Sequence, residues 1–292
     1  MQSSLPQGVF DKRFVDHVFL EYKLTGDNSL AQVRKALKAV NEQANDGLLV
    51  TIAFGPKVSQ QFDNAPQLPN YGEATHLVDT QADVWVWLQG KDRGTTFDAA
   101  RTTNQLLGEA VTLAREVVGF VYHDSRDLTG FVDGIGNPDG EKALAAAIIP
   151  EGKPGEGGSV VLTQQWRHDL AAFHQLPQQE QEDVIGHTKP DAQEYDDDVM
   201  PANAHVGRVD VSKDGVVQRL WRRSVPYGNS QEHGLYFLSF ACEWERYAFL
   251  LKRMFGATED GITDRLTEFT QLVSGAWWFC PSQTQLDQWL QG

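Results

Sequence analysis

The feature of this 292-residue sequence that most restricts its fold is an order of strand-like and helix-like segments that occurs twice. In the first half, alternating apolar and polar residues over 18–24 predict a half-buried strand, and apolar residues at helical spacing over 30–40 predict a helix. The other predicted segments are strands at 48–54 and 83–88, a long helix over 97–118 and a short strand at 120–122. The predicted order is therefore β-α-β-β-α-β.

The second half follows the same theme. Its expected elements are strands at 159–163, 206–211, 217–222 and 235–241 and helices at 177–185, 243–255 and 263–273. The β-α-β-β-α-β order of the first half is that of a ferredoxin-like unit, and the second half repeats this theme in its element order. We therefore predict an α+β protein with two ferredoxin-like halves, residues 1–149 and 150–292, whose sheets pack together. The glycine- and proline-rich stretch 150–158 is the expected connection.

The composition excludes several classes of protein. An apolar fraction of 41% and a charged fraction of 22% are ordinary for a soluble domain, and no apolar run approaches the roughly 20 residues of a spanning helix. A net charge of −15 disfavours nucleic acids and anionic membranes as partners because both would be repelled. The first residues do not resemble an export signal, so we expect a cytoplasmic protein. Cys242 and Cys280 are expected as buried free thiols.

A first candidate functional segment is the turn-rich stretch 124–138. It contains three glycines, Asp133 and the pair Asn137-Pro138, which together predict an irregular, tightly turned backbone. The spacing resembles a phosphate-binding glycine loop only loosely, because no clear apolar helix follows it. On spacing alone the segment is either an ordinary inter-domain turn or part of a site.

Four further residues could carry chemistry. His205 is one of eight histidines, none of which has the spacing of a zinc site, and a lone histidine before a predicted strand is more often structural than a ligand. Arg222 and Arg223 are neighbours on a predicted strand, so they should point to opposite faces, and the buried one requires an anionic partner. Asp264 lies at the start of a predicted helix, where a carboxylate stabilises the N-terminus.

Together these segments resemble the dye-decolourising peroxidase family, specifically its bacterial cytoplasmic branch. The resemblance covers the chain from residue 124 onward and consists of several motifs in one order. The matching segments are Gly130–Gly134, similar to the family's G-x-x-D-G signature and extended here through Asn137-Pro138; 176–186; His205, at the place of the proximal haem histidine; and Arg222 with Ser224 and 226–228, similar to the distal arginine strand.

The resemblance implies a peroxidase in which both halves pack around a haem pocket. The cofactor would be haem b, and hydrogen peroxide would oxidise dyes, phenolics or other small organic reductants. His205 would bind the iron while Asp264 accepts a hydrogen bond from its other ring nitrogen. On the opposite side, Asp133 would move a proton between the peroxide oxygens, Arg222 would stabilise developing charge, and Ser224 would order a water. We also expect a homo-oligomer, because exposed sheet edges favour self-association.

Two alternatives stay open at this point. A haem- or porphyrin-handling protein would share His205 but would not need a distal acid and arginine, and a haem-free α/β scaffold would need none of these residues. The family branch often has an acidic residue before the Asn-Pro pair, where this chain has Gly136. This departure puts a haem contact in question rather than the acid–base chemistry.

Overall fold

Within residues 5–26 and 29–292, which the computed structural model describes, nine strands form one sheet that closes on itself. The elements before residue 150 are β1 (Asp16–Leu24), α1 (Leu30–Asn41), β2 (Leu48–Phe54), α2 (Pro56–Ser59), α3 (Tyr71–Thr75), β3 (Val84–Gly90), α4 (Arg93–Leu107), the 3-10 helix η3 (Gly108–Ala110), β4 (Val111–Phe120) and α5 (Gly140–Ala147). The later elements are β5 (Ser159–His168), α6 (Leu170–Phe173), α7 (Gln178–Ile185), α8 (His205–Val209), β6 (Ser212–Lys213), β7 (Val216–Val217), β8 (Trp221–Arg222), β9 (Val225–Gly228), β10 (His233–Ala241), α9 (Trp244–Met254), the 3-10 helix η4 (Arg265–Glu268), β11 (Thr270–Cys280) and α10 (Gln283–Gln291).

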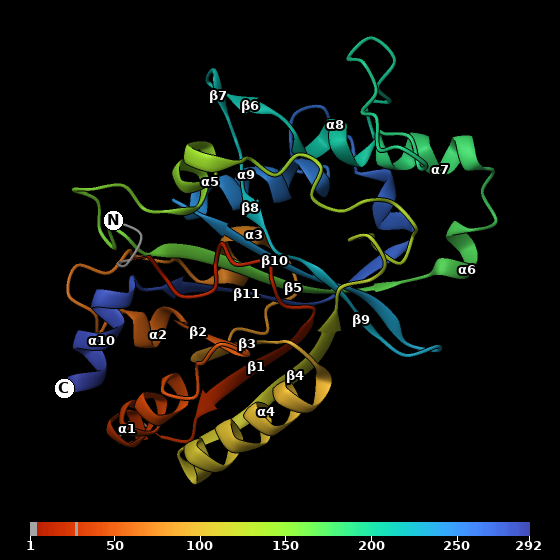
Figure 1. The fold of residues 1–292 in the computed structure, drawn as a ribbon. Coiled ribbons are helices and arrows are strands. Elements are labelled where there is room, and N and C mark those ends of the chain that lie inside the picture. Colours follow the sequence, from red (N-terminus) through yellow and green to blue (C-terminus); the bar gives the residue numbers. More distant parts are fainter. Residues whose placement is uncertain (1–4, 27–28) are drawn as a thin grey trace.

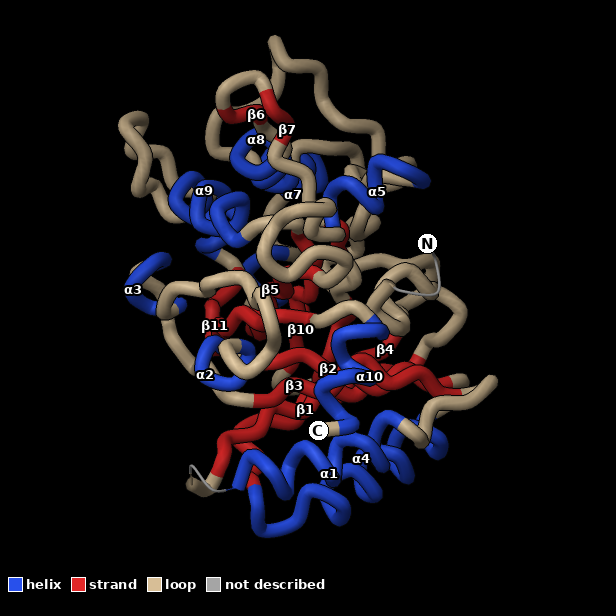
Figure 2. The backbone as a smooth tube through the Cα atoms, turned by 90° about the vertical axis from the view of Figure 1, so that its left-hand side faces the viewer, coloured by secondary structure: helices blue, strands red, loops and turns tan. Residues whose placement is uncertain are grey.

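Each half contributes a four-stranded antiparallel sheet, in the order β2-β3-β1-β4 and then β11-β5-β10-β9. Element order and strand order are those of a ferredoxin-like unit in both halves, so the predicted fold class is confirmed. Two narrow seams join the sheets edge to edge: Phe54 pairs with Phe279, and Gly119 pairs with Tyr227. The result is a barrel-like ring of strands, with α1 and α4 on one side of the molecule and α7, α8 and α9 on the other (Figure 1, Figure 2).

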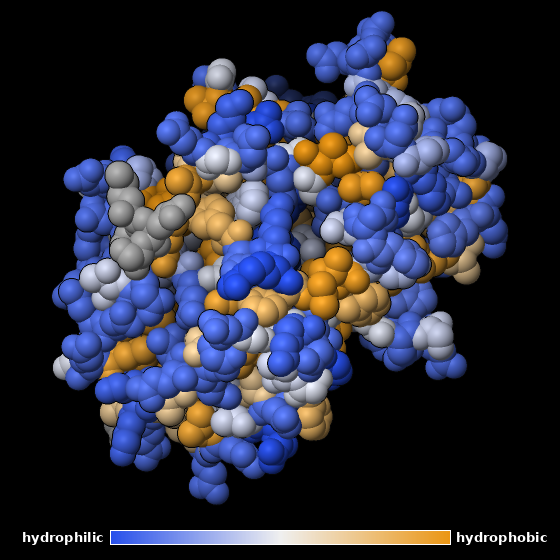
Figure 3. All heavy atoms as spheres, in the orientation of Figure 1, coloured by the Kyte–Doolittle hydropathy of each residue, from blue (hydrophilic) through white to orange (hydrophobic). Residues whose placement is uncertain are grey.

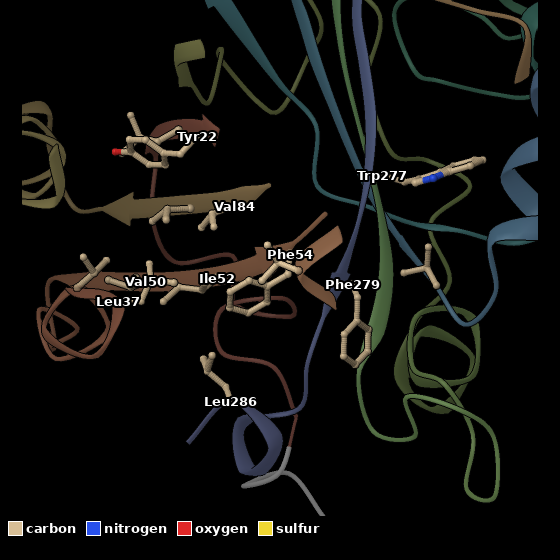
Figure 4. Packing of buried hydrophobic residues seen from close by; sticks show 14 of the residues in the cluster. Tyr22, Leu37, Val50, Ile52, Phe54, Val84, Trp277, Phe279 and Leu286 are labelled. Atoms are coloured by element: carbon tan, nitrogen blue, oxygen red, sulfur yellow. The ribbon is translucent and has the colours of Figure 1, made fainter. Parts of the chain in front are cut away.

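Both faces of most of this sheet are buried, whereas β4 is exposed over 112–114. Apolar side chains on the outer face pack against α1, α4 and α10, and Figure 4 shows part of this cluster. Side chains on the inner face form a second cluster that includes the aromatic rings of Phe19, Trp85 and Trp278. The strand predicted as half-buried over 18–24 is buried on both sides as far as Tyr22, whereas Lys23 is exposed. Glu21, one of the polar positions of that alternating pattern, is only 2% exposed because the closed ring surrounds it.

Glu21 is a carboxyl group enclosed by the ring of strands. The Tyr236 hydroxyl donates to its Oε1 over 3.1 Å, and the Arg115 Nε lies 3.4 Å from its Oε2. Burial raises the pKa of Glu21 from 4.5 to about 7, and the positive charge of Arg115 only partly offsets this effect. The native protein therefore holds a proton that the unfolded chain releases at lower pH.

This difference predicts a pH-dependent effect of Glu21→Gln on stability. Below pH 4.5 the carboxyl is neutral in both states; between pH 4.5 and 7 only the unfolded chain ionises, so stability falls as pH rises through this window. We expect the variant, which stays neutral, to raise the free energy of unfolding by about 3 kcal/mol at pH 8 and by little at pH 4. Urea unfolding at both pH values measures this. The exposed neighbour-strand change Glu116→Gln is the control, and an equal effect of Glu21→Gln at both pH values would contradict the prediction.

Several predicted elements are wrong. The helix predicted over 97–118 ends at Leu107, because Gly108 adopts a φ of 52° that stops it, and 111–120 is strand β4 paired with β1. The strand predicted at 206–211 is helix α8, and the helix predicted at 263–273 is η4 followed by β11. The strand predicted at 217–222 is interrupted between β7 and β8. These segments take their conformation from distant partners, such as β5 for β11, which local periodicity does not contain.

Other features of the chain agree with the composition. Across the described residues, no helix is long and apolar enough to cross a bilayer. The face shown in Figure 3 is mostly hydrophilic, with apolar side chains in small groups. Cys280 is buried as expected, whereas Cys242 is half-buried; both are free thiols. The division of the chain into halves 1–149 and 150–292 stays a prediction.

Candidate active site

A cavity lies in the C-terminal half, between the outer face of β5 and β10 and the helices α7, α8 and α9. The space between its walls, the open mouth included, is about 1520 Å³. Its walls are mostly apolar, and the loop 127–136 is the part of the N-terminal half that reaches it. The apolar walls suit an organic ligand with apolar faces.

His205 is the first residue of α8 and lines this cavity. Its Nδ1 donates a hydrogen bond to Oδ2 of Asp264 over 2.7 Å, and Asp264 is completely buried. The second carboxylate oxygen of Asp264 accepts from the backbone N–H of Leu266 over 2.9 Å, so the same residue begins the 3-10 helix η4. The imidazole side chain is 31% exposed. Because Nδ1 carries the shared proton, Nε2 is the nitrogen left to bind a ligand.

The short helix α8 is held in place by Arg208, which sequence reasoning missed. Arg208 is 2% exposed, its Nη1 donates to Oδ2 of Asp260 over 2.8 Å, and its Nε and Nη2 donate to the Arg253 carbonyl. The backbone N–H of Arg265 donates to the Asn203 carbonyl over 2.9 Å. These bonds connect the segment that carries His205 with the segment that carries Asp264. The imidazole therefore has a fixed orientation. No sequence signal indicated this role, because residues 206–211 were predicted as a strand rather than as the helix α8.

Asp133 and Arg222 line the same cavity from two different segments. Asp133 lies in the turn-rich loop, where Gly130 and Gly134 adopt φ values of 89° and 81°. Burial raises the pKa of Asp133 above its ordinary value, and the positive charge of Arg222 acts in the opposite direction. Among the described residues, Arg222 forms no ion pair. The cavity therefore contains a carboxyl of raised pKa and a guanidinium that has no ion-pair partner within the described part of the chain.

Arg223 points away from this cavity, as the strand geometry predicts. Its Nη1 donates to the Val9 and Gly8 carbonyls over 2.8 and 3.1 Å, and its Nη2 donates to Oε1 of Gln89 over 3.0 Å. The expectation that a buried arginine requires an anionic partner is wrong here, because these acceptors are neutral oxygens. Burial lowers the pKa of Arg223 to about 10, so the guanidinium stays charged at neutral pH.

The remaining predicted positions lie around Arg222. Ser224 is outside the described cavity lining, and its Oγ accepts from the Leu238 N–H over 3.3 Å; its role in ordering a water stays a prediction. At Gly136 an added Cβ would lie 3.5 Å from Nη2 of Arg222 and 3.9 Å from carboxylate oxygens of Asp210 and Glu194. The acidic side chain that the family branch often has at this position would therefore lie near Arg222.

Two histidines that sequence reasoning did not select also line the cavity. His168 Nε2 lies 3.1 Å from Oδ1 of Asp127, and His187 Nδ1 donates to the Thr188 carbonyl over 2.9 Å. Burial would raise the pKa of Asp127, but hydrogen bonds with His168 and Thr129 outweigh it and hold that pKa below its usual value. Neither histidine has a distinctive sequence context, so only the fold brings them here.

The fold and site together define an α+β protein with a mostly apolar cavity that is lined by His205, itself bonded to the buried Asp264, and by Asp133 and Arg222. The family model "Dyp-type peroxidase, C-terminal" matches residues 124–285, and "Dyp-type peroxidase, N-terminal" matches residues 24–121. This chain belongs to the Dyp-type peroxidase family.

Individual relatives agree with this assignment. Dye-decolorizing peroxidases of Mycolicibacterium paratuberculosis and Mycobacterium tuberculosis are 37% and 36% identical over 212 residues, 71% of this chain in each case. These matches cover 60% and 63% of the relatives' own length, so the chain spans less than two thirds of either protein. A variant of DypB from Rhodococcus jostii RHA1 in complex with heme superposes with a TM-score of 0.85 at 30% identity, covering 96% of this chain and 97% of that one. A Bacteroides thetaiotaomicron dye-decolorizing peroxidase reaches 0.87 at 28% identity, covering 99% and 100%.

Proposed function

We propose that this protein is a haem-dependent peroxidase that uses hydrogen peroxide to oxidise dyes, phenolics or other small organic reductants. The observation that carries the proposal is that one apolar cavity is lined by His205, which is hydrogen-bonded to the buried Asp264, and by the pair Asp133 and Arg222. A haem-handling protein would need only the first pair. Family membership and the haem complex of the Rhodococcus relative support the same assignment.

The residues present fit a haem. The cavity is mostly apolar, as the faces of a porphyrin require, and no hydrogen bond within the described part of the chain occupies Nε2 of His205. Arg219 also lines the cavity, so a second cationic side chain is available for the porphyrin carboxylates. His205 would hold the iron. Bound haem supplies an open coordination position for peroxide and the electrons that cleavage of the O–O bond requires.

The side chains supply the proton transfer and the charge stabilisation. Asp133 accepts a proton from one peroxide oxygen and returns it to the other, so the leaving oxygen departs as water. Arg222 stays protonated throughout, and its charge stabilises the negative charge that develops on the leaving oxygen. Asp264 keeps the proton on Nδ1 of His205 and makes the imidazole a more basic ligand. By resemblance, Ser224 is assigned the ordering of a water beside Arg222.

Adding hydrogen peroxide to the haem-loaded protein tests this function. We expect a rapid change of the Soret band that two electron equivalents of a phenolic reductant reverse, because an enzyme returns to its resting state after each turnover. Absorption in a stopped-flow instrument measures both phases. Slow, irreversible bleaching would instead favour a haem-handling role, and a protein that takes up no haem would reject both.

We also propose that the protein is cytoplasmic and forms a homo-oligomer. In the described sheet, β4 pairs with β9 through a single residue pair, and Leu113 on β4 is 40% exposed. A strand edge of this kind favours pairing with a second copy. Sedimentation of the haem-loaded protein measures the oligomeric state.

A further inference from the structure

The outer edge of strand β8 forms hydrogen bonds with a side chain that has no role in the proposed reaction so far. On its inner edge β8 pairs with β10: Arg222 lies opposite Ser239, and the Arg223 N–H donates to the Leu238 carbonyl over 2.7 Å. Within the described sheet no strand follows β8 on the other side. The backbone N–H and C=O of Arg222 point to this free edge, because these groups alternate between the two edges of a strand.

The side-chain amide of Asn137 occupies that edge. Its Nδ2 donates to the Arg222 carbonyl over 2.9 Å, and its Oδ1 accepts from the Arg222 N–H over 2.8 Å. One amide thus replaces the missing strand residue and satisfies both backbone groups of Arg222. Arg222 is thereby held from both sides, by β10 and by Asn137.

Asn137 is also rigidly connected to Asp133. The Asn137 N–H donates to the Gly134 carbonyl over 3.0 Å and closes a tight turn. Gly134 has a φ of 81°, and a Cβ at this position would lie 3.1 Å from Nδ2 of Asn137, so a side chain would crowd the amide. Pro138 restricts the backbone of Asn137 to extended conformations. The turn therefore transmits the position of Asn137 to the neighbouring Asp133.

We propose that Asn137 is the positioning residue of the peroxide reaction: its amide fixes the carboxyl of Asp133 relative to the guanidinium of Arg222. This inference rests on the proposed function, since it assigns the geometry of the same two groups. Proton transfer and charge stabilisation must act on the two oxygens of one peroxide molecule, so a small change in the separation of the groups has a large effect. A displacement of about 1 Å can slow an enzyme on the order of 100-fold.

Asn137→Ala in the haem-loaded protein tests the proposal. We expect the second-order rate of the peroxide-induced Soret change to fall on the order of 10- to 100-fold, with unchanged haem content and an unchanged rate of the later reduction step. The acid limb of the rate–pH profile should also move to higher pH. The charge of Arg222 lowers the pKa of Asp133, so displacing that charge raises the pKa, and the base is lost earlier as pH falls. A purely structural role would not move this limb.

Asn229→Ala is the matched control. The Asn229 side chain also binds two backbone groups, the N–H groups of Gln231 and Glu232 over 2.8 and 3.0 Å, but it lies in the turn between β9 and β10, outside the described cavity lining. We expect this control to react with peroxide within about twofold of the wild type, as surface changes away from a site have small effects.

Asn137→Asp covers the case in which the alanine variant does not retain haem. It keeps the acceptor for the Arg222 N–H but lacks the donor to the Arg222 carbonyl, so a slowed peroxide step with a shifted acid limb is again expected. A wild-type rate and acid limb in the haem-loaded variant would overturn the positioning role. If Asp133→Asn were slow in the same assay, the proposed function would stand and only the positioning role of Asn137 would fall. If Asp133→Asn were also as fast as the wild type, the proposed function itself would fall.

Discussion

Replacing His205, the proposed iron ligand, with alanine is expected to lower the rate of peroxide-driven oxidation at least about 100-fold, since even the partners behind a metal-bound histidine are worth about 10–100-fold. The change also leaves the fully buried carboxylate of Asp264 without its histidine partner. We therefore expect weaker haem binding and a Soret band without the signature of imidazole ligation. Absorption spectra and dye turnover of the haem-reconstituted variant measure these effects.

Added imidazole sharpens this test. A free imidazole can enter the space left by the side chain, coordinate the iron through one nitrogen and donate a hydrogen bond to Asp264 from the other. We expect it to restore the ligation spectrum and part of the activity in His205→Ala only. His174→Ala, which removes an exposed histidine, is the control and should match the wild type. Unchanged axial ligation in His205→Ala without imidazole would reject His205 as the ligand.

Replacing Asp133 with asparagine is expected to slow the reaction with peroxide on the order of 10²- to 10⁴-fold, the range of a general acid–base group. Asparagine has nearly the same shape but cannot take up a proton. In the wild type the rate should fall as pH drops through the pKa of Asp133, because only the ionised form is a base. Burial raises that pKa, so this acid limb should lie above the value near 3.9 of a free aspartate. In Asp133→Asn the limb should disappear.

Asp127→Asn is the matched control for this prediction. Asp127 belongs to the same loop and lines the same cavity, but its oxygens are engaged by His168 and Thr129. It is therefore not free to shuttle a proton, and its replacement should leave the acid limb in place. Stopped-flow measurements of the peroxide step across the acidic range compare the two variants. A full-rate Asp133→Asn enzyme with an unchanged pH profile would exclude Asp133 as the proton shuttle.

The local sequence predicted some parts of the molecule better than others. Strands β2, β3 and β10 are apolar along most of their length, because both of their faces are buried, and their positions were predicted closely. The segment around His205 was assigned to the wrong element. A five-residue helix contains too few turns to show a period, and its shape depends on buried contacts of Arg208 with residues near 253 and 260.

What the sequence by itself determined is the fold class and the identity of the residues expected in the site, because strand and helix periods are local and the family motifs retain their order along the chain. The tertiary structure decided which groups touch. Only the fold shows the hydrogen bond from His205 to Asp264, the neutral acceptors around Arg223 and the amide of Asn137 on the backbone of Arg222. Each of these contacts joins residues far apart in the chain, and it exists only where ring closure and short irregular segments bring them within hydrogen-bond distance.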